Sequence, residues 1–460
     1  MLRLSKLFLL GALGLVSCAH EPAAQPPTPK VEAQFSAQGN AADSHWFEQF
    51  KDADLVQLIA QARKANPDLE IARAHEREAL ATLTAASGTR QPTLDAQASF
   101  LPSQISTDTG RWFPGMPRQT NVTSVGVATS WELDFWGKKT ANIVATEADY
   151  RTAIYSAAQS DLALCAEVAR LWFSLCEARE EVACLEQEFK ARYREMELLE
   201  KNVKAGLLPT DPLSSAQLAA AQAKVDEGLG RRRLLAAENA LRAIIGAQPG
   251  AALPVRKNFA PVAALPNFGP GVASDLLKQR PDLMVAATKF DASVAREGAA
   301  MADFYPSVML TGQAGWQADP VSRLGRSSAG FWSLGPSIDL PLFDGDRRET
   351  NLEIARARMQ GAAAEWRKAV ISACREVEDA LGDLRELALQ EDLTQRVVQA
   401  TQERLVNAEA RFKAGVANEA EVIAATRDVL LAKRTLASVV WERREVAVRL
   451  ATATGGGWKP

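Results

Sequence analysis

A unit of roughly 210 residues occurs twice in this chain of 460 residues, and this duplication limits what the chain can fold into. The motif NPDL at 66–69 returns as RPDL at 280–283, an offset of 214 residues. The motif KAG at 204–206 returns at 413–415, an offset of 209 residues. Between the two units lies the proline-rich stretch 247–270. The sequence therefore predicts two similar halves joined by a linker.

Each unit contains one very long predicted helix. No glycine or proline occurs from 138 to 205, where Ala, Glu, Leu and Arg dominate. At a rise of about 1.5 Å per residue, such a helix would be about 100 Å long. The second copy, at about 348–414, is interrupted only by Gly361 and Gly382. Both helices end at a KAG motif, where Gly206 and Gly415 can adopt the left-handed conformation that closes a helix.

Four shorter helices accompany the long ones. Two return from the KAG turns, at about 212–246 and 418–454, and two precede the strands, at about 52–88 and 271–303. Because 212–246 and 271–303 together nearly match the long helix in length, we expect them to stack end to end beside it. The linker 247–270 would cross this join. An ordinary helical bundle is the alternative, but helices far longer than the average of about 11–12 residues favour a coiled-coil-like rod.

Four segments of alternating character lie between the short and the long helices, at about 93–104, 121–134, 307–318 and 329–342. Apolar residues such as Val127 occupy one face, and polar residues such as Ser130 occupy the other. This pattern is typical of a transmembrane β-barrel, although a half-buried soluble sheet also shows it. Four strands cannot close a barrel, because about eight are needed, so the strands must be pooled between chains. Three copies would supply twelve.

Residues 1–17 have the features of a signal peptide, with a basic start and an apolar run from Leu7 to Val16 that is too short to span a bilayer. The ending LVSC at 15–18 resembles the lipobox of bacterial lipoproteins, whose cysteine receives a diacylglycerol and becomes the first mature residue. We therefore predict a covalent lipid on Cys18 and a lipid-anchored segment at 18–51. Since an aspartate after the cysteine usually signals inner-membrane retention, Ala19 favours the outer membrane. No apolar run of about 20 residues follows, so a barrel is the expected spanning structure.

Composition argues against several other classes. Lys plus Arg is 53 and Asp plus Glu is 56, a balance that gives no electrostatic reason to expect nucleic acid as a partner. The three histidines, His20, His45 and His75, are followed by 385 residues without another, which argues against His-dependent hydrolases and zinc enzymes. We expect no catalytic residue, no metal site and no cofactor apart from the lipid. The other four cysteines are expected to be small packing residues: Cys165, Cys176, Cys184 and Cys374.

The chain resembles the TolC-like outer membrane efflux proteins, and in particular their lipoprotein branch (OprM-like, NodT-type). The resemblance covers the whole mature chain in order. It is carried by WFEQF at 46–50, NPDL at 66–69, WELDFWG at 131–137, RPDL at 280–283, PLFDG at 341–345 and GGGW at 455–458.

This resemblance implies an α+β membrane protein. Its trimeric, twelve-stranded transmembrane β-barrel, with four strands per chain, would lie in the outer membrane and continue into a long α-helical tunnel in the periplasm. The first repeat would span 52–246, with its helical hairpin at 138–246. The second would span 271–455, with its hairpin at 348–454. The linker 247–270 would lie at an equatorial collar, and 456–460 would form a tail.

The resemblance also implies a function without a chemical step. The homotrimer would be the exit duct of a tripartite efflux system, passively conducting small molecules such as drugs or toxic compounds to the exterior. Its partners would be a periplasmic adaptor (membrane fusion protein), an inner-membrane transporter of the RND type and outer-membrane lipids. Conductance would depend on the constriction and on the charge of the lining.

In the family it resembles, rings of hydrophobic and acidic side chains close the tunnel at the periplasmic helix tips, just after the second KAG motif. The corresponding positions here are Ala420 and Ala424, which cannot form such rings, so the chain departs from the family at the gate. Three acidic residues lie nearby: Glu419, Glu421 and Asp428. The last two are seven residues apart and thus share a helical face. All three acids are candidate pore residues or, alternatively, solvated surface residues.

Two other classes remain as alternatives. An exit duct for type I protein secretion shares the fold, and its operon or co-purified partners would distinguish it. A periplasmic adaptor lipoprotein also has helical hairpins, but it would carry a lipoyl-like β-domain and would lack the duplicated alternating strands.

Overall fold

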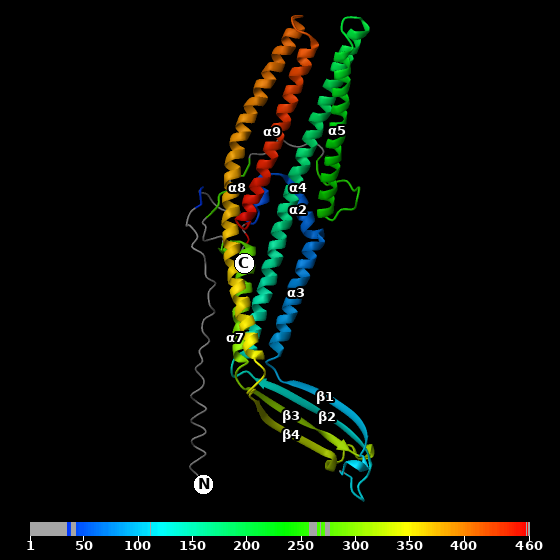
Figure 1. Cartoon of the computed structure of the whole chain (residues 1–460), viewed down its shortest axis with the longest axis vertical. Coiled ribbons are helices and arrows are strands. Elements are labelled where there is room, and N and C mark those ends of the chain that lie inside the picture. The colour runs from blue at the N-terminus through cyan, green and yellow to red at the C-terminus, as the bar shows by residue number, and fades with distance from the viewer. Residues whose placement is uncertain are drawn as a thin grey trace. The chain divides into compact units, whose positions relative to one another are not determined.

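The computed structural model describes residues 35–37, 43–110, 112–256, 265–266, 268–271, 277–456 and 458 (Figure 1). The predicted signal peptide and Cys18 lie outside these residues. Both halves show the same order of elements: a short helix, two strands, a long helix and a return helix. Of the helices in the described part of the chain, none combines the length and the apolar character needed to cross a membrane.

The predicted duplication and its four strands are confirmed. Both long helices, α4 and α8, have 67 residues. The first half contains α2 (Ala53–Ala65), α3 (Pro67–Gly88), β1 (Thr93–Gln104), β2 (Gln119–Leu133), α4 (Lys138–Lys204) and α5 (Asp211–Ile244). The second half contains α7 (Pro281–Ala302), β3 (Ser307–Ala318), β4 (Gly330–Asp339), α8 (Arg347–Lys413) and α9 (Glu419–Ala453).

The predicted single helix at 52–88 is wrong, because the chain breaks it at Asn66. This residue is extended (φ −77°, ψ 124°) and separates α2 from α3. A residue before proline disfavours the helical conformation, and Pro67 itself fits the first position of a new helix. The Asn66 side chain accepts hydrogen bonds from the backbone N–H groups of Asp68 (2.9 Å) and Leu69 (3.3 Å). Asn66 therefore ends one helix and caps the next.

The expected stacking of 212–246 on 271–303 is also wrong. Asn66 Nδ2 donates to the carbonyl of Ile244 (3.1 Å), which is the last residue of α5. In the second repeat, Arg280 Nη1 donates to the carbonyl of Ala453 (3.0 Å), which is the last residue of α9. The last carbonyls of a helix lack partners within that helix, and these side chains supply them. Each return helix thus ends at the short helix of its own repeat. Residues 272–276 lie outside the described part.

The four strands form one antiparallel sheet in the order β1-β2-β3-β4. Its register aligns the two predicted faces across all four strands. One row contains Ala96, Val127, Ala314 and Trp332. A polar row contains Thr93, Ser130, Thr311 and Gly335. Because successive residues of a strand point to opposite faces, the predicted apolar and polar faces are confirmed.

The helices of the two hairpins lie side by side in one layer. Arg231 pairs with Glu186 (2.8 Å) between α5 and α4, and Arg427 pairs with Glu195 (3.8 Å) between α9 and α4. Arg404 pairs with Asp428 (2.6 Å) between α8 and α9. These pairs give the order α5-α4-α9-α8, with α5 and α8 at the two edges. The layer therefore resembles the sheet in having two edges that this chain leaves open.

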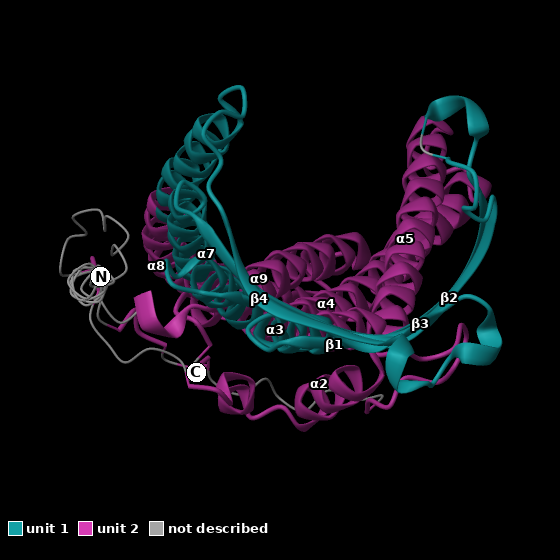
Figure 2. Cartoon of the chain, turned by 90° about the horizontal axis from the view of Figure 1, so that it is seen from below, with its two compact units in different colours: residues 1–28, 77–152, 286–366 teal, residues 29–76, 153–285, 367–460 magenta. Residues whose placement is uncertain are grey.

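The described residues divide into two compact units (Figure 2). One unit includes 77–152 and 286–366 and contains the sheet. The other includes described residues of 29–76, 153–285 and 367–460, and it has its own aromatic core. There, Phe50 packs on Phe173 (ring centroids 5.2 Å apart), and Phe173 stacks on Trp441 (6.0 Å). Trp172 Nε1 donates to the Asp52 carboxylate (2.7 Å). The segment before α2 is thus fixed to the middle of α4.

Candidate functional site

The KAG motifs form two equivalent turns. Gly206 and Gly415 have positive φ values of 71° and 72°, as predicted for residues that close a helix. The N–H of the next residue bonds back in each case, from Leu207 to Asn202 (2.9 Å) and from Val416 to Arg411 (3.0 Å). These bonds satisfy carbonyls at the helix ends. That the turns form the periplasmic tip of a tunnel stays a prediction.

Glu419, the first of the three candidate acids, joins the two hairpins. It accepts hydrogen bonds from Arg194 on α4, at Nε (2.7 Å) and Nη2 (3.2 Å). The hydrogen bonds from Arg194 hold the pKa of Glu419 below its ordinary value, with a smaller contribution from the charge of Lys201. Glu419 therefore fixes α9 to α4 near the turns, and its charge is compensated.

The other two acids pair with α8. Glu421 approaches Arg411 (3.1 Å), and Asp428 approaches Arg404 (2.6 Å). These arginines are seven residues apart, as the acids are, so the pairs form a ladder between the antiparallel helices. All four side chains are more than two-fifths exposed, and such ion pairs contribute little to stability. The structure thus brings the candidate acids together on one face, but each one has a neutralising arginine.

This pairing sets the expected result of neutralising the acids. Glu421→Gln and Asp428→Asn each leave an arginine unpaired, so a channel lined by this face should become more selective for anions. Arg404→Gln should shift selectivity towards cations. The reversal potential of planar bilayers under a KCl gradient measures both shifts. Unchanged selectivity in all three variants would identify the ladder as solvated surface, which was the alternative interpretation.

Ala420 and Ala424, the positions that correspond to the gate of the family, lie between the three candidate acids in the sequence. Ala420 is exposed and Ala424 is half-buried, and neither side chain extends past its Cβ. The paired acids and arginines have the reach that these alanines lack, as do the exposed Phe412 and Val416 at the turn itself. The two arginines lie on α8, before the turn, whereas the predicted gate residues were all placed on the helix that follows it. Their seven-residue spacing, mirrored across Gly415, was the available signal.

The two faces of the sheet predict different responses to charge. Val127 is 46% exposed on the apolar face, and Ser130 lies on the polar face. If the apolar face contacts lipid, Val127→Arg near the midplane should destabilise the folded barrel by about 2–4 kcal/mol. Ser130→Arg should have a much smaller effect because its side chain would reach water. Heat resistance of the assembled protein on gels compares the two variants, and equal losses would contradict the assignment of the faces.

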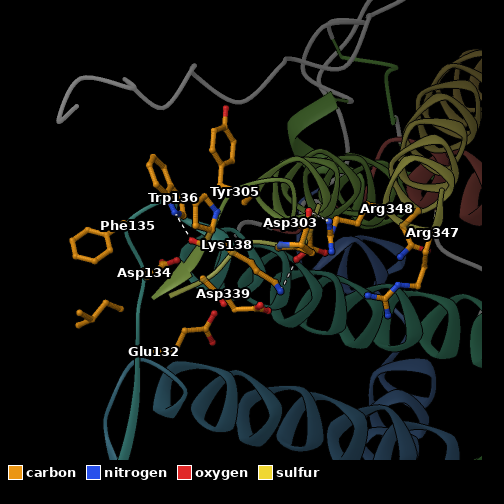
Figure 3. A pocket seen from close by; sticks show the side chains of 16 residues that line it. Glu132, Asp134, Phe135, Trp136, Lys138, Asp303, Tyr305, Asp339, Arg347 and Arg348 are labelled. Atoms are coloured by element: carbon orange, nitrogen blue, oxygen red, sulfur yellow. Dashed lines mark hydrogen bonds and ion pairs between the residues drawn. The ribbon is translucent and has the colours of Figure 1, made fainter. Parts of the chain in front are cut away.

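The connection between sheet and helices is held by Asp134 and Trp136 of the WELDFWG motif and by Tyr305, none of which had a predicted structural role. The Asp134 carboxylate accepts hydrogen bonds from the backbone N–H groups of Lys139 (3.0 Å) and Thr140 (2.8 Å) at the start of α4. Trp136 stacks on Tyr305 (ring centroids 4.9 Å apart). These side chains line a pocket of about 320 Å³ (Figure 3). Since Trp136 Nε1 donates to the Pro306 carbonyl (2.7 Å) and Lys138 pairs with Asp303 (2.5 Å) across it, we interpret it as a brace between β2–α4 and α7–β3.

The cysteines behave as packing residues in the described part of the chain. All four described cysteines are free, and Cys165 and Cys176 are buried. Burial raises the pKa of the Cys165 thiol to about 12, and burial also raises the pKa of Cys176. Protonated thiols in these positions are poor nucleophiles, which agrees with the predicted packing role.

Comparison with known proteins agrees with this architecture. A model of the outer membrane efflux protein family matches residues 58–247 and 272–456, which correspond to the two repeats. The chain is 28% identical to the cation efflux system protein CusC of Escherichia coli (strain K12) over 459 residues, covering 97% of this chain and 98% of CusC. It is 29% identical to the outer membrane protein OprJ of Pseudomonas aeruginosa, covering 98% of this chain and 95% of OprJ.

A solved structure gives the same result. The open state of the Neisseria gonorrhoeae MtrE outer membrane channel superimposes with a TM-score of 0.82 at 27% identity, covering 95% of this chain and 98% of MtrE. The predicted fold class, outer-membrane location and efflux-channel function are confirmed. The chain therefore belongs to the outer membrane efflux protein family.

Proposed function

We propose that three copies of this chain form one closed duct, which serves as the exit channel of a tripartite efflux pump. A periplasmic adaptor and an RND-type inner-membrane transporter would be its partners. The observation that carries this proposal is that both layers of the chain have open edges. The sheet ends at β1 and β4, and the helical layer ends at α5 and α8. Cyclic repetition closes both layers at once.

The outer helices support this assembly. The edge helix α5 exposes Leu218, Val225 and Leu229 at a spacing that places them on one face. The edge helix α8 exposes Leu389, Leu393 and Val397, which are four residues apart. Neighbouring copies would cover these stripes. Four strands per chain give twelve in a trimer, which exceeds the roughly eight needed to close a barrel.

Transport in such a duct would be passive. The polar face of the sheet would line the lumen, and the apolar face would contact lipid. The related proteins carry different cargoes by name, since CusC is a cation efflux protein and TtgI of Pseudomonas putida belongs to a toluene efflux pump. We propose small drugs or toxic compounds as the cargo class here. An exit duct for type I protein secretion is the second candidate, and cross-linked membrane pull-down of the partner pump would distinguish the two.

Two measurements test the proposed duct. Native mass spectrometry in mild detergent should give a mass of three chains, and the same preparation should form ion-conducting pores in planar bilayers. A stable folded monomer would contradict the pooled barrel. A continuous duct would be contradicted by a trimer that shows no conductance at any applied voltage, either as the wild type or with the Glu421→Gln and Asp428→Asn substitutions.

The lipid anchor is a separate prediction. The LVSC ending predicts that the mature chain begins at Cys18 with a diacylglycerol on its thiol. Intact mass spectrometry of outer-membrane material should show the added lipid mass, and Cys18→Ser should lose it. Because assembly depends on the strands, the Cys18→Ser protein should still form trimers. An unmodified mature N-terminus in the wild type would rule the anchor out.

A further inference from the structure

A cavity of about 610 Å³ lies between α4 and the last part of α9. The start of α7 and Glu376 of α8 complete its wall. On α4 its residues include Ala163, Ala166 and Arg170, which lie on the opposite side of the helix from Asp161 and Trp172 at 100° per residue. Asp161 and Trp172 bond to α2 and to the segment just before it. The cavity therefore opens on the face of the helical layer that is turned away from α2.

The floor of the cavity is apolar and is formed by small side chains. It includes Leu162, Ala163, Ala166, Pro281, Val448 and Ala453. Its volume falls within the range of about 300–1,000 Å³ that is usual for small-molecule sites. No aromatic side chain lines it among the described residues, so an apolar ligand body would rest on aliphatic carbon.

The three arginines of the cavity wall are already bonded to carboxylates. Arg170 donates twice to Glu167 (2.8 and 2.6 Å), and Arg449 approaches Asp383 (3.3 Å). Arg280 is almost fully buried and donates to Asp282, Glu376 and the Ala453 carbonyl. An anionic ligand would have to displace one of these carboxylates, which disfavours anions.

Glu445 is the exception among the charged residues of the wall. Within the described part of the chain, it accepts no hydrogen bond and forms no ion pair within 4.0 Å. Burial raises its pKa, and the charges of Arg170 and Arg449 oppose this effect. A half-buried carboxylate without a hydrogen-bonding partner is stabilised by any cation that reaches it.

We propose that this cavity binds amphiphilic organic monocations, with a substituted ammonium head against Glu445 and an alkyl body against Leu162, Ala166 and Val448. A single free carboxylate is suited to a single positive charge. The small residues of the floor leave room for a chain of several carbons. A metal ion is disfavoured because no cluster of three or more His, Cys, Asp or Glu that could hold one occurs among the described residues.

Cation binding by the cavity does not depend on the proposed duct. The location of the cavity in a lumen does depend on it. If α2 belongs to the collar around the tunnel, the face turned away from α2 is the lumen, and the cavity would hold cationic cargo in transit. That part rests on the proposed function. Binding measured on the purified protein tests the site, whereas bilayer conductance tests the duct, so the two can fail separately.

Calorimetric titration of the full-length protein in a neutral maltoside detergent tests the site, with hexyltrimethylammonium as the probe. This cation is expected to bind, whereas hexanesulfonate, with the same chain and opposite charge, is not. Glu445→Gln keeps the shape of the side chain and should weaken binding at least about tenfold. Ala166→Leu fills the floor and should abolish binding while the helical circular dichroism spectrum is unchanged.

Glu442→Gln is the matched control, because it removes an exposed acid within one turn of Glu445 whose charge acts on Glu445 but which does not line the cavity. It should weaken binding of hexyltrimethylammonium by no more than about twofold. The proposal is overturned if the wild type does not bind this cation, or if Glu445→Gln and Glu442→Gln have equal effects. It is also overturned if hexanesulfonate binds as tightly as the cation, which would show that an arginine of the wall is the true anchor.

Discussion

Replacing Gly315 with valine is expected to abolish nearly all assembled, heat-resistant protein. Gly315 of β3 and Gly126 of β2 face each other in the register. A Cβ atom built on Gly315 would overlap the Val125 carbonyl oxygen and lie 2.6 Å from the Gly126 Cα. A Cβ on Gly126 would likewise lie 2.6 Å from the Ala314 carbonyl oxygen. Both obstacles are backbone atoms, so only a separation of the two strands relieves the clash.

That separation would break ladder hydrogen bonds at the centre of the sheet, which is why the expected effect is large. Gly335 of β4 provides a matched control, since no atom lies within 4 Å of a Cβ built there. Gly335→Ala should assemble as the wild type does. The measurement is the fraction of chain that migrates as assembled protein on gels before and after boiling. Wild-type assembly of Gly315→Val would mean that β2 and β3 are not in this register.

The strands and the long helices could be predicted because their signals are local and repeated. Alternation fixes the face of each residue in a strand, and the register confirms it across the sheet for residues as far apart as Ala96 and Trp332. The absence of glycine and proline from 138 to 205 likewise sets the bounds of α4, which ends at Lys204. The positive φ of Gly206 follows from the same local chemistry.

One error was local, and the other concerned contacts between distant segments. The break at Asn66 was missed because Pro67 fits a helix start as well as it fits a kink, and the flanking residues are helix formers. The partner of each return helix was assigned from length alone. Because α3 and α7 both have 22 residues, length cannot distinguish between them. The deciding interaction is the bond from Asn66 to Ile244, which joins residues 178 positions apart. No local pattern contains that bond.

The second repeat replaces this asparagine with Arg280, and truncating that arginine is expected to have the second large effect. Arg280 makes two hydrogen bonds to Asp282 (3.0 and 2.7 Å), one to Glu376 (2.8 Å) and one to the Ala453 carbonyl (3.0 Å). Its side chain is only 8% exposed. Arg280→Ala would leave the Asp282 carboxylate and a helix-terminal carbonyl without the donor that Arg280 supplies, and Glu376 would keep only its bond from Ser372 (3.1 Å). We expect a loss of about 3 kcal/mol, at the lower end for a buried pair because both acids are partly exposed.

Three further variants make this prediction specific to the join between α9 and α7. Asn66→Ala removes one hydrogen bond and one cap at the corresponding join, so it should cost about 1–2 kcal/mol. Arg280→Lys keeps the charge but cannot reproduce the fork, so it should fall between wild type and Arg280→Ala. Arg375→Ala removes an exposed arginine of α8 that is 3.9 Å from Asp379, and it should change stability by less than about 0.5 kcal/mol. Thermal unfolding followed by far-ultraviolet circular dichroism, at one scan rate for all variants, gives the order of stability. If Arg280→Ala unfolds at the same temperature as Arg375→Ala, Arg280 does not hold the end of α9. The likeness between the two joins would then have no effect on stability.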